Sequence, residues 1–334
     1  MPAPLADCPA LAPGAGQPDA ALDQRWTPSG PGWAGGDATY SVALPDGRTV
    51  WIFGDTFIGA VSPDRQRGPG TAMVRNSAVV EDHGALRTLI SGTPGHPGSL
   101  VTADPGSWFW PGDGVVEGQE LRLFMTRFRA TGGGEWDFGA AETVVASFAL
   151  PDLRFQGIRR VADAAPVTWG AATLETADGT YVYGVEDAHP GGFAHVARAR
   201  NGIQGAWEYW TGRGWSDRAA DSARVAAGVS NQFSVIAAGG QYVLVNQAPV
   251  FGRQIAVAPA ADPWGPFDAV TPVYTAPSPG PGRYAYNATA HPEASSGGRL
   301  LVSYNTNSFD PATVRSDADS YRPRFVQVPL CGGG

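Results

Sequence analysis

The sequence predicts an all-β protein whose strands form a five-bladed β-propeller. Glycine and proline are abundant, with 45 Gly and 29 Pro in 334 residues, and they separate many short apolar runs, a pattern typical of strands joined by turns. No helical periodicity of useful length appears. Strand–turn–strand segments open near residues 37, 113, 170, 232 and 291. Units that recur at this spacing are typical of propeller blades.

Each predicted blade begins with the strand expected nearest the axis, and later strands lie farther out. The strands are expected at 35–42, 51–56, 75–80 and 86–90 in blade one; 108–116, 119–127 and 142–148 in blade two; 167–174, 181–187 and 194–198 in blade three; 230–236, 241–247 and 255–258 in blade four; and 286–293, 300–305 and 324–328 in blade five. A small sheet cannot bury both faces alone, so the blades are expected to pack side by side around one axis.

The two ends of the chain carry its only cysteines. Residues 1–24 are expected to form a lead-in, and residues 25–334 a single propeller domain. Closing a ring brings the chain ends together, so a disulfide between Cys8 and Cys331 is predicted, worth about 4–5 kcal/mol in the chain-entropy model. Two unpaired cysteines are the alternative. A disulfide belongs to an oxidising compartment, which predicts a secreted protein.

The charge pattern argues against two classes of partner. Charged residues make up 16% of the chain, and the formal net charge is −8. Nucleic-acid binders carry a basic stripe, and none is visible, so nucleic acid is not expected as a partner. No apolar run approaches the length needed to span a bilayer, so no membrane association is expected.

Polar residues recur where the predicted strands meet one face of the ring. The first strand of each blade starts at this face, and the second strand runs back to end there. The residues so placed are Asp37, Asp113, Trp169, Gln232 and His291 at strand starts, and Asp55, Arg127, Glu186, Asp187, Asn246, Gln247 and Asn305 at strand ends. Any one of the aspartates is better explained as a turn former. The whole set is harder to explain by turn chemistry, and carboxylates with aromatic side chains around a channel favour a sugar site.

Further motifs resemble those of known enzymes. The turn Asp262-Pro263-Trp264-Gly265-Pro266-Phe267 is similar to one that follows a third blade strand in five-bladed propeller glycoside hydrolases, namely arabinanases, family 43 and family 62 arabinofuranosidases, fructan hydrolases and endo-D-arabinanases. Over residues 33–325 the chain also resembles a group of actinobacterial secreted proteins known as a domain of unknown function. Segments 51–57, 110–114, 183–187 and 301–305 carry this second resemblance.

The resemblance implies roles for particular residues. In the hydrolases a blade-one Asp is the base or nucleophile, a blade-two Asp orients it, and a Glu from a later blade is the acid; Asp37 and Asp113 match the first two positions. Gln232 stands where the related proteins are expected to carry the acid, and an amide has no proton to donate. Either Gln232 marks an inactivated variant, or Glu186 is the acid, or the chain does not hydrolyse. The expected substrate-binding residues are Asp55, Asn76, Trp110, Arg127, Trp169, Asp187, Asn231, His291 and Asn305.

These features predict a secreted, monomeric glycoside hydrolase that acts on a furanose-containing oligo- or polysaccharide such as arabinan. A lectin-like propeller without turnover and a non-hydrolytic propeller enzyme, such as a cyclase, are the alternatives. Lectin propellers usually repeat one site in every blade, whereas the five positions here differ, which favours one composite active site. No cofactor is expected. A structural Ca²⁺ in the central channel, near His291, is one interpretation of that histidine, and a core histidine is the other.

Overall fold

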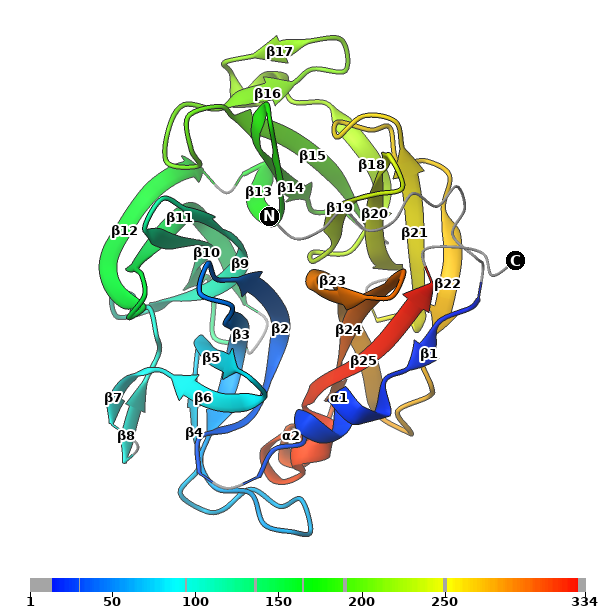
Figure 1. The fold of residues 1–334 in the computed structure, drawn as a ribbon. Coiled ribbons are helices and arrows are strands. Elements are labelled where there is room, and N and C mark those ends of the chain that lie inside the picture. Colours follow the sequence, from blue (N-terminus) through cyan, green and yellow to red (C-terminus); the bar gives the residue numbers. More distant parts are fainter. Residues whose placement is uncertain are drawn as a thin grey trace.

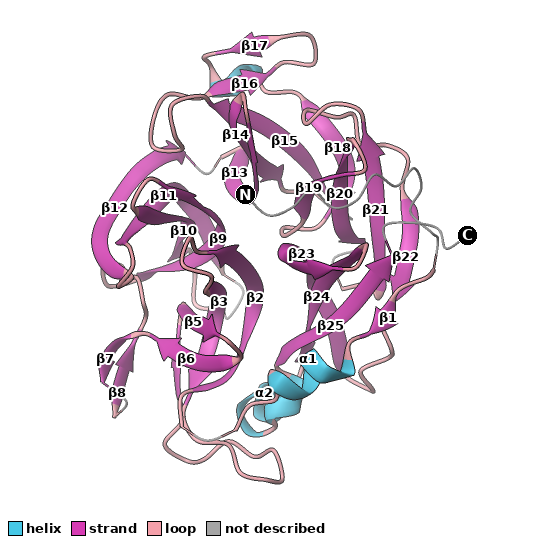
Figure 2. Cartoon of the chain, viewed as in Figure 1, coloured by secondary structure: helices cyan, strands magenta, loops and turns pink. Residues whose placement is uncertain are grey.

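The computed structural model describes residues 14–329 except 30, 94, 135–136, 164, 189–190 and 249–250. Five small antiparallel sheets are arranged in a ring (Figure 1), which confirms the five-bladed β-propeller. Strands make up nearly all of the described regular structure, and the helices are short and peripheral (Figure 2). Cys8 and Cys331 lie outside the described residues, so the disulfide stays a prediction. No described helix has the length and apolar character needed to cross a membrane.

The first three blades account for most of the strands. Blade one contains β2 (Trp33–Ala43), β3 (Thr49–Ile58), β5 (Ser77–Asp82) and β6 (Ala85–Leu89), with β4 (Ala72–Val74) beside β3 and the hairpin β7 (Ser91–Thr93) and β8 (His96–Gly98) after it. Blade two contains β9 (Ser107–Glu117), β10 (Glu120–Ala130), β11 (Phe138–Ala149) and β12 (Arg154–Asp163). Blade three contains β13 (Val167–Thr176), β14 (Gly179–Glu186), β15 (Gly192–Ala199), β16 (Glu208–Trp210), β17 (Trp215–Ser216) and β18 (Arg224–Val229), with the 3₁₀ turn η1 (Ala219–Asp221).

The last two blades complete the ring. Blade four contains β19 (Ser234–Ala238), β20 (Gln241–Ala248), β21 (Gln254–Ala260) and β22 (Thr271–Thr275). Blade five contains β23 (Arg283–Ser296), β24 (Arg299–Ser308), β25 (Arg322–Pro329) and, as its outer strand, β1 (Gln17–Pro18). The helices are α1 (Ala20–Arg25), which follows β1, and α2 (Pro311–Ser316) with the 3₁₀ turn η2 (Ala318–Ser320), which lie between β24 and β25.

The hydrophobic core is divided among the interfaces between blades. Along β10, Leu123 and Met125 join the cluster shared with blade one, whereas Phe124 joins the cluster shared with blade three. This alternation follows from the two-residue period of a strand, which points successive side chains to opposite faces. Each blade is therefore apolar on both faces and depends on its neighbours for burial.

The chain closes the ring with its N-terminal segment. Strand β1 pairs with β25, so blade five takes its outer strand from the segment predicted as a lead-in. Trp26, which follows α1, is buried against Trp51 and Phe53 of blade one and Phe325 of blade five. The segment from β1 to Trp26 thus links the first and last blades independently of any disulfide.

Candidate active site

Asp37 and Asp55 come from the first hairpin of the chain and lie at the same end of it. Asp37 is on β2 and Asp55 is on the antiparallel strand β3, where the pairing register shifts between Gly36 and Ala38. The Asp37 carboxyl lies close to the backbone of Gly54, where a larger residue would not fit, because a Cβ atom at Gly54 would lie 2.5 Å from Oδ1 of Asp37. As whole residues, Asp37 and Asp55 are partly exposed. We call this face of the ring the Asp37 face.

Among the described residues, Asp37 has hydroxyl partners and no ion-paired cation. The Tyr286 hydroxyl donates to Oδ2 of Asp37 at 3.0 Å. The Tyr321 hydroxyl, which donates to the backbone carbonyl of Asp55 at 3.0 Å, also interacts with the Asp37 carboxyl. Burial, and then the neighbouring charge of Asp55, raise the pKa of Asp37 to about 7, although the two hydroxyls act in the opposite direction. Asp37 therefore holds a proton close to neutral pH.

Asp55 is surrounded by groups that favour its ionised form. Arg75 forms an ion pair with Oδ2 of Asp55 at 3.0 Å, and the Trp110 indole N–H donates to Oδ1 at 2.8 Å. Burial raises the pKa of Asp55, and both of these partners oppose the rise. The pair is therefore asymmetric, with the proton on Asp37 and the charge on Asp55. Two carboxyls in unequal surroundings are the usual arrangement of an acid and its ionised partner.

The backbone around Asp37 is held in an unusual conformation by amide side chains. Ala38 and Thr39 have positive φ angles of 70° and 64°, a region that non-glycine residues seldom occupy. The Asn305 amide donates to the Gly36 carbonyl at 3.2 Å, and the Gln232 amide donates to the Ala38 carbonyl at 2.6 Å. Gln232 therefore positions the backbone beside Asp37 in this chain, and its origin as a converted acid stays a prediction.

Tyr321 reaches the pair from the segment between β24 and β25. The buried Arg67 guanidinium anchors that segment by donating to the backbone carbonyls of Val314 and Asp317, at 2.5 and 3.1 Å. It also donates to the Ala34 carbonyl of β2 at 2.8 Å. Arg67 therefore connects the segment that carries Tyr321 to the strand that carries Asp37.

Asp113 lies elsewhere, between the inner strands of blades two and three. Its carboxylate accepts hydrogen bonds from the Thr173 backbone N–H at 2.7 Å, the Thr173 hydroxyl at 2.9 Å and the Gly114 N–H at 2.8 Å. Burial raises the pKa of Asp113 to about 6. The acidic side chain that acts on it most is Glu175, and no hydrogen bond joins Asp113 to Asp37 among the described residues. The structure thus pairs Asp37 with Asp55, where the resemblance paired it with Asp113.

His291 is a buried core histidine. Its ring nitrogens contact the hydroxyls of Ser41 and Ser303, the latter at 2.8 Å, and its ring packs on Trp51 at 4.8 Å. Burial lowers the pKa of His291 to about 3, so the ring is neutral. The described residues contain no group of three or more His, Cys, Asp or Glu side chains that could hold a metal ion. This environment does not fit the predicted Ca²⁺ site.

Glu186 reaches the Asp37 face but is held as an anion. Arg224 binds both of its carboxylate oxygens, at 2.8 and 2.7 Å, and Nε2 of His195 lies 3.1 Å from Oε2. These partners lower the pKa of Glu186 to about 2. A carboxylate that is ionised throughout the neutral range has no proton to transfer, so the geometry argues against Glu186 as the acid.

The remaining predicted binding residues separate into three groups. Trp110 and Asn305 belong to the acid pair's surroundings, as described above. Others serve the scaffold: Asn76 bonds the backbone of Val101 and Phe109, Arg127 pairs with Asp104 and Glu142, and Trp169 is buried against Trp207 and Tyr209. Asp187 and Asn231 are exposed. No hydrogen bond or ion pair between described residues joins any of these five to Asp37 or Asp55.

Three residues beside the acid pair were not anticipated from the sequence. Tyr286 begins the strand predicted at 286–293, so the strand-start rule could have selected it. Arg75 begins a predicted strand and gave a weaker signal. Tyr321 lies in the segment between β24 and β25, outside the regular blade pattern, and no spacing in the sequence pointed to it.

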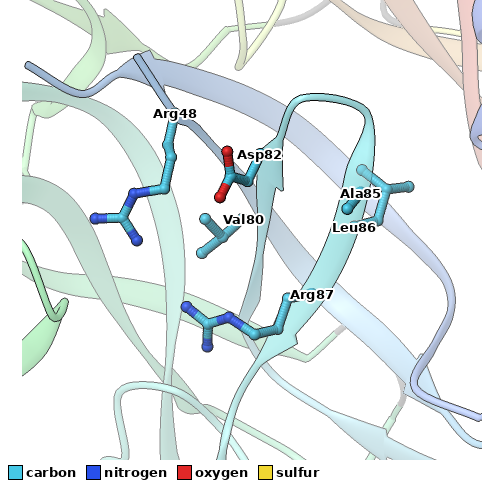
Figure 3. Close-up of a pocket in the computed structure, with 6 residues that line it drawn as sticks. All are labelled: Arg48, Val80, Asp82, Ala85, Leu86 and Arg87. Carbon is cyan, nitrogen blue, oxygen red and sulfur yellow. The ribbon is translucent and has the colours of Figure 1, made fainter. Parts of the chain in front are cut away.

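A separate pocket of about 210 Å³ lies on blade one (Figure 3). It is lined by Arg48, Val80, Asp82, Ala85, Leu86 and Arg87. These residues surround the β2–β3 and β5–β6 turns, which lie at the opposite ends of the strands from Asp37 and Asp55. The pocket is therefore distinct from the acid pair.

Comparison with solved structures identifies similar folds. A Bacteroides ovatus protein provisionally described as a hydrolase has a TM-score of 0.81 and 22% identity over 96% of this chain and 93% of that one. An α-L-arabinofuranosidase from Lactobacillus brevis has a TM-score of 0.54 and 12% identity over 89% and 90%. A GH43_1 enzyme from Xanthomonas citri, complexed with xylotriose, has a TM-score of 0.52 and 13% identity over 92% of both chains. The fold is thus shared with glycoside hydrolases.

Sequence comparison gives the family. Among curated proteins, none matches the chain. The model of one family matches residues 19–329, which run from the residue before α1 to the end of β25. The protein therefore belongs to the family described as Domain of unknown function (DUF5005).

Proposed function

We propose that this protein is a secreted glycoside hydrolase that cleaves a furanose-containing glycan such as arabinan. The observation that carries the proposal is the Asp37–Asp55 pair, in which one carboxyl keeps a proton near neutral pH and the other is ion-paired to Arg75. Glycoside hydrolysis needs two carboxyls with different protonation states. The fold shared with an arabinofuranosidase and a GH43_1 enzyme supports the same class of reaction.

The two carboxyls divide the chemistry between them. Asp37 transfers its proton to the glycosidic oxygen as the bond from that oxygen to the anomeric carbon breaks. Asp55 supplies the negative charge, either by attacking the anomeric carbon or by taking a proton from the attacking water. Arg75 and the Trp110 indole favour the ionised form of Asp55, and burial favours the protonated form of Asp37. This assignment places the acid on Asp37, so neither Gln232 nor Glu186 is required for that role.

The test is release of sugars from furanose-containing glycans, separated by chromatography. The wild-type chain is compared with Asp37→Asn and Asp55→Asn, and with Asp104→Asn as a control, because Asp104 is an exposed carboxylate paired with Arg127. We expect products from the wild type and the control, and loss of nearly all turnover in the two site variants. Retained activity in Asp37→Asn would exclude the assignment. Binding of the glycan by the wild type without products would support the lectin-like alternative instead.

A further inference from the structure

Two exposed phenylalanines lie together on the Asp37 face. Phe251 is 52% exposed and Phe309 is 63% exposed, and their ring centroids are 6.0 Å apart. Tyr284 of β23 packs against both rings, at 4.7 Å from Phe251 and 4.5 Å from Phe309. We call Phe251, Tyr284 and Phe309 the aromatic platform. Clustered exposed aromatic rings mark interaction sites more often than scattered ones do.

The backbone that carries the platform is well braced. The Phe309 N–H donates to the Gly282 carbonyl at 2.8 Å, and the Ser308 hydroxyl donates to the same carbonyl at 3.2 Å. On the other side, the buried Gln247 amide donates to the Gly252 carbonyl at 2.5 Å, next to Phe251. The two rings are therefore presented to solvent from held positions, which lowers the entropic cost of binding a ligand.

The platform is continuous with the acid pair. Tyr284 and Tyr286 lie on the same face of β23, with ring centroids 5.2 Å apart, and the Tyr286 hydroxyl donates to Asp37. Asn307, two residues before Phe309, donates to that hydroxyl at 3.2 Å. Tyr286 thus contacts both the platform and the candidate acid Asp37, and it is the only side chain needed to connect them.

A second aromatic group lies on the other side of the pair, on blade two. Trp110 donates to Asp55 and packs against Trp108 and Phe128, at 5.7 and 4.6 Å. The Arg75 guanidinium, which pairs with Asp55, lies 4.8 Å from the centroid of the Trp108 ring. The acid pair on blade one is therefore flanked by aromatic side chains from blade two and from blades four and five.

We propose that the aromatic platform is a sugar subsite beyond the two that flank the cleaved bond, and that the substrate is a glycan chain cut at internal linkages. The inference rests on the proposed function and extends it to the length of the substrate. Sugar rings present apolar C–H faces that pack on aromatic rings, and the platform and the blade-two group would hold units on both sides of the cleaved bond. The platform's continuity with Tyr286 and Asp37 favours the substrate as its occupant over a second protein.

The test measures binding separately from turnover, on the Asp37→Asn chain, by calorimetric titration with an arabino-disaccharide and an arabino-hexasaccharide. Phe251→Ala and Phe309→Ala are added together. The control is Phe155→Ala, which removes a 44% exposed ring from the outer strand of blade two. We expect the double substitution to weaken hexasaccharide binding about tenfold and to leave disaccharide binding unchanged, while the control changes neither. Equal losses for both sugars, or no loss, would overturn the platform.

Two further readouts separate the possible failures. In the wild-type chain, internal cleavage of linear arabinan gives a ladder of oligosaccharides at early times, and release of only the smallest sugars would overturn internal cleavage. A wild type that binds the hexasaccharide through the platform but forms no product would reject the hydrolase while keeping the subsite. Sedimentation velocity tests self-association: a dimer that the two Phe→Ala substitutions disperse would assign the platform to protein contact and overturn the proposal.

Discussion

Two sets of buried carboxyls lie near the ring axis, and they differ in their partners rather than in their pKa values. Burial raises the pKa to about 7 for Asp37, about 6 for Asp113 and about 7 for Glu293. On the Asp37 face the neighbouring carboxyl is paired with the Arg75 guanidinium. Farther along β2, the Ser41 hydroxyl donates to Glu293, and Asp113 is held by Thr173 and by its own neighbour Gly114. None of these partners of Asp113 and Glu293 is a cation.

This difference shows that a raised pKa alone does not identify a catalytic acid. Burial acts on every carboxyl in the interior of the ring, so it raises all three pKa values. A proton donor is useful when an ionised partner stands beside it, because the reaction needs both forms at once. Asp113 and Glu293 also have carboxyl neighbours, Glu175 and Asp113 respectively. Among the described residues, only the neighbour of Asp37 is ion-paired to a guanidinium. Asp113, in contrast, accepts hydrogen bonds that connect two blades.

The largest expected difference in turnover is between the variants Asp37→Asn and Asp113→Asn. Asp37→Asn should lower turnover about a thousandfold, because the proton donor is lost. Asp113→Asn should lower the free energy of unfolding by about 1–3 kcal/mol, because the amide keeps only one acceptor oxygen and therefore loses either the Thr173 hydrogen bonds or the Gly114 hydrogen bond. Turnover and denaturant unfolding of both variants provide the measurement. A thousandfold loss of turnover in a fully folded Asp113→Asn chain would remove the distinction.

The pH dependence of stability sharpens the first prediction. The folded-state pKa of Asp37, about 7, lies above its ordinary value of 3.8, so the folded protein binds this proton more tightly than the unfolded chain does. The stability that Asp37 contributes is therefore complete below about pH 4 and is lost as the pH rises through 7. Asp37→Asn does not titrate there, so its unfolding free energy should gain on that of the wild type between pH 5 and 8.

Arg75 is the group that makes the pair on the Asp37 face unequal, and removing it should have the next largest effect. Arg75→Met should raise the pKa of Asp55 above its value in the wild type, because the guanidinium that lowers this pKa is removed. The rising limb of the pH–kcat/KM profile should move to higher pH, and activity at a fixed pH on that limb should fall about tenfold for a one-unit rise in the pKa of Asp55. Arg127→Met is the matched control, since Arg127 pairs with Asp104 and Glu142. A shift of the limb in the control alone would contradict this account.

The sequence predicted the ring more completely than the site. Strand alternation and recurring turns repeat in every blade, so the five openings could be located by pattern. The same geometry correctly placed Asp37 and Asp55 at one end of a hairpin. It could not rank them, because the difference between the carboxyls arises from Arg75, Trp110 and the tyrosines, which come from four separate segments.

The strand-end rule also selected residues that belong to the scaffold. Arg127 and Trp169 occupy positions with the expected polarity or aromatic character, yet Arg127 pairs with Asp104 and Glu142, and Trp169 is buried in the core shared by blades two and three. Whether such a side chain turns toward the axis or into the neighbouring sheet depends on local bulges, such as those at Gly170 and Ala38. Periodicity does not reveal these bulges, because each one inserts a residue and changes the face of those that follow.

Gln232→Glu tests whether the deeper part of the ring contains a lost acid. The Gln232 amide donates to the Ala38 carbonyl and to Thr289, and a carboxylate would place oxygen against that carbonyl. We expect a loss of about 1–3 kcal/mol in unfolding free energy and no gain in turnover, measured by denaturant unfolding and product release. Activity that appears only in Gln232→Glu would move the acid from Asp37 to position 232.

Glu186→Gln should have the smallest effect on turnover, since Glu186 is ionised, bound by Arg224 and not in contact with Asp37 or Asp55 among the described interactions. Because the lowered pKa of Glu186 is about 2 against an ordinary 4.5, its stabilising effect is present above pH 4.5 and is lost as the pH falls toward 2. The variant should therefore match the wild type in kcat/KM at pH 7. In a series of melting temperatures measured at different pH values, the difference in stability between the variant and the wild type should be smallest at the lowest pH. A large loss of kcat with an unchanged melting temperature would instead give blade three a proton donor, and the asymmetry between Asp37 and Asp55 would no longer account for the chemistry.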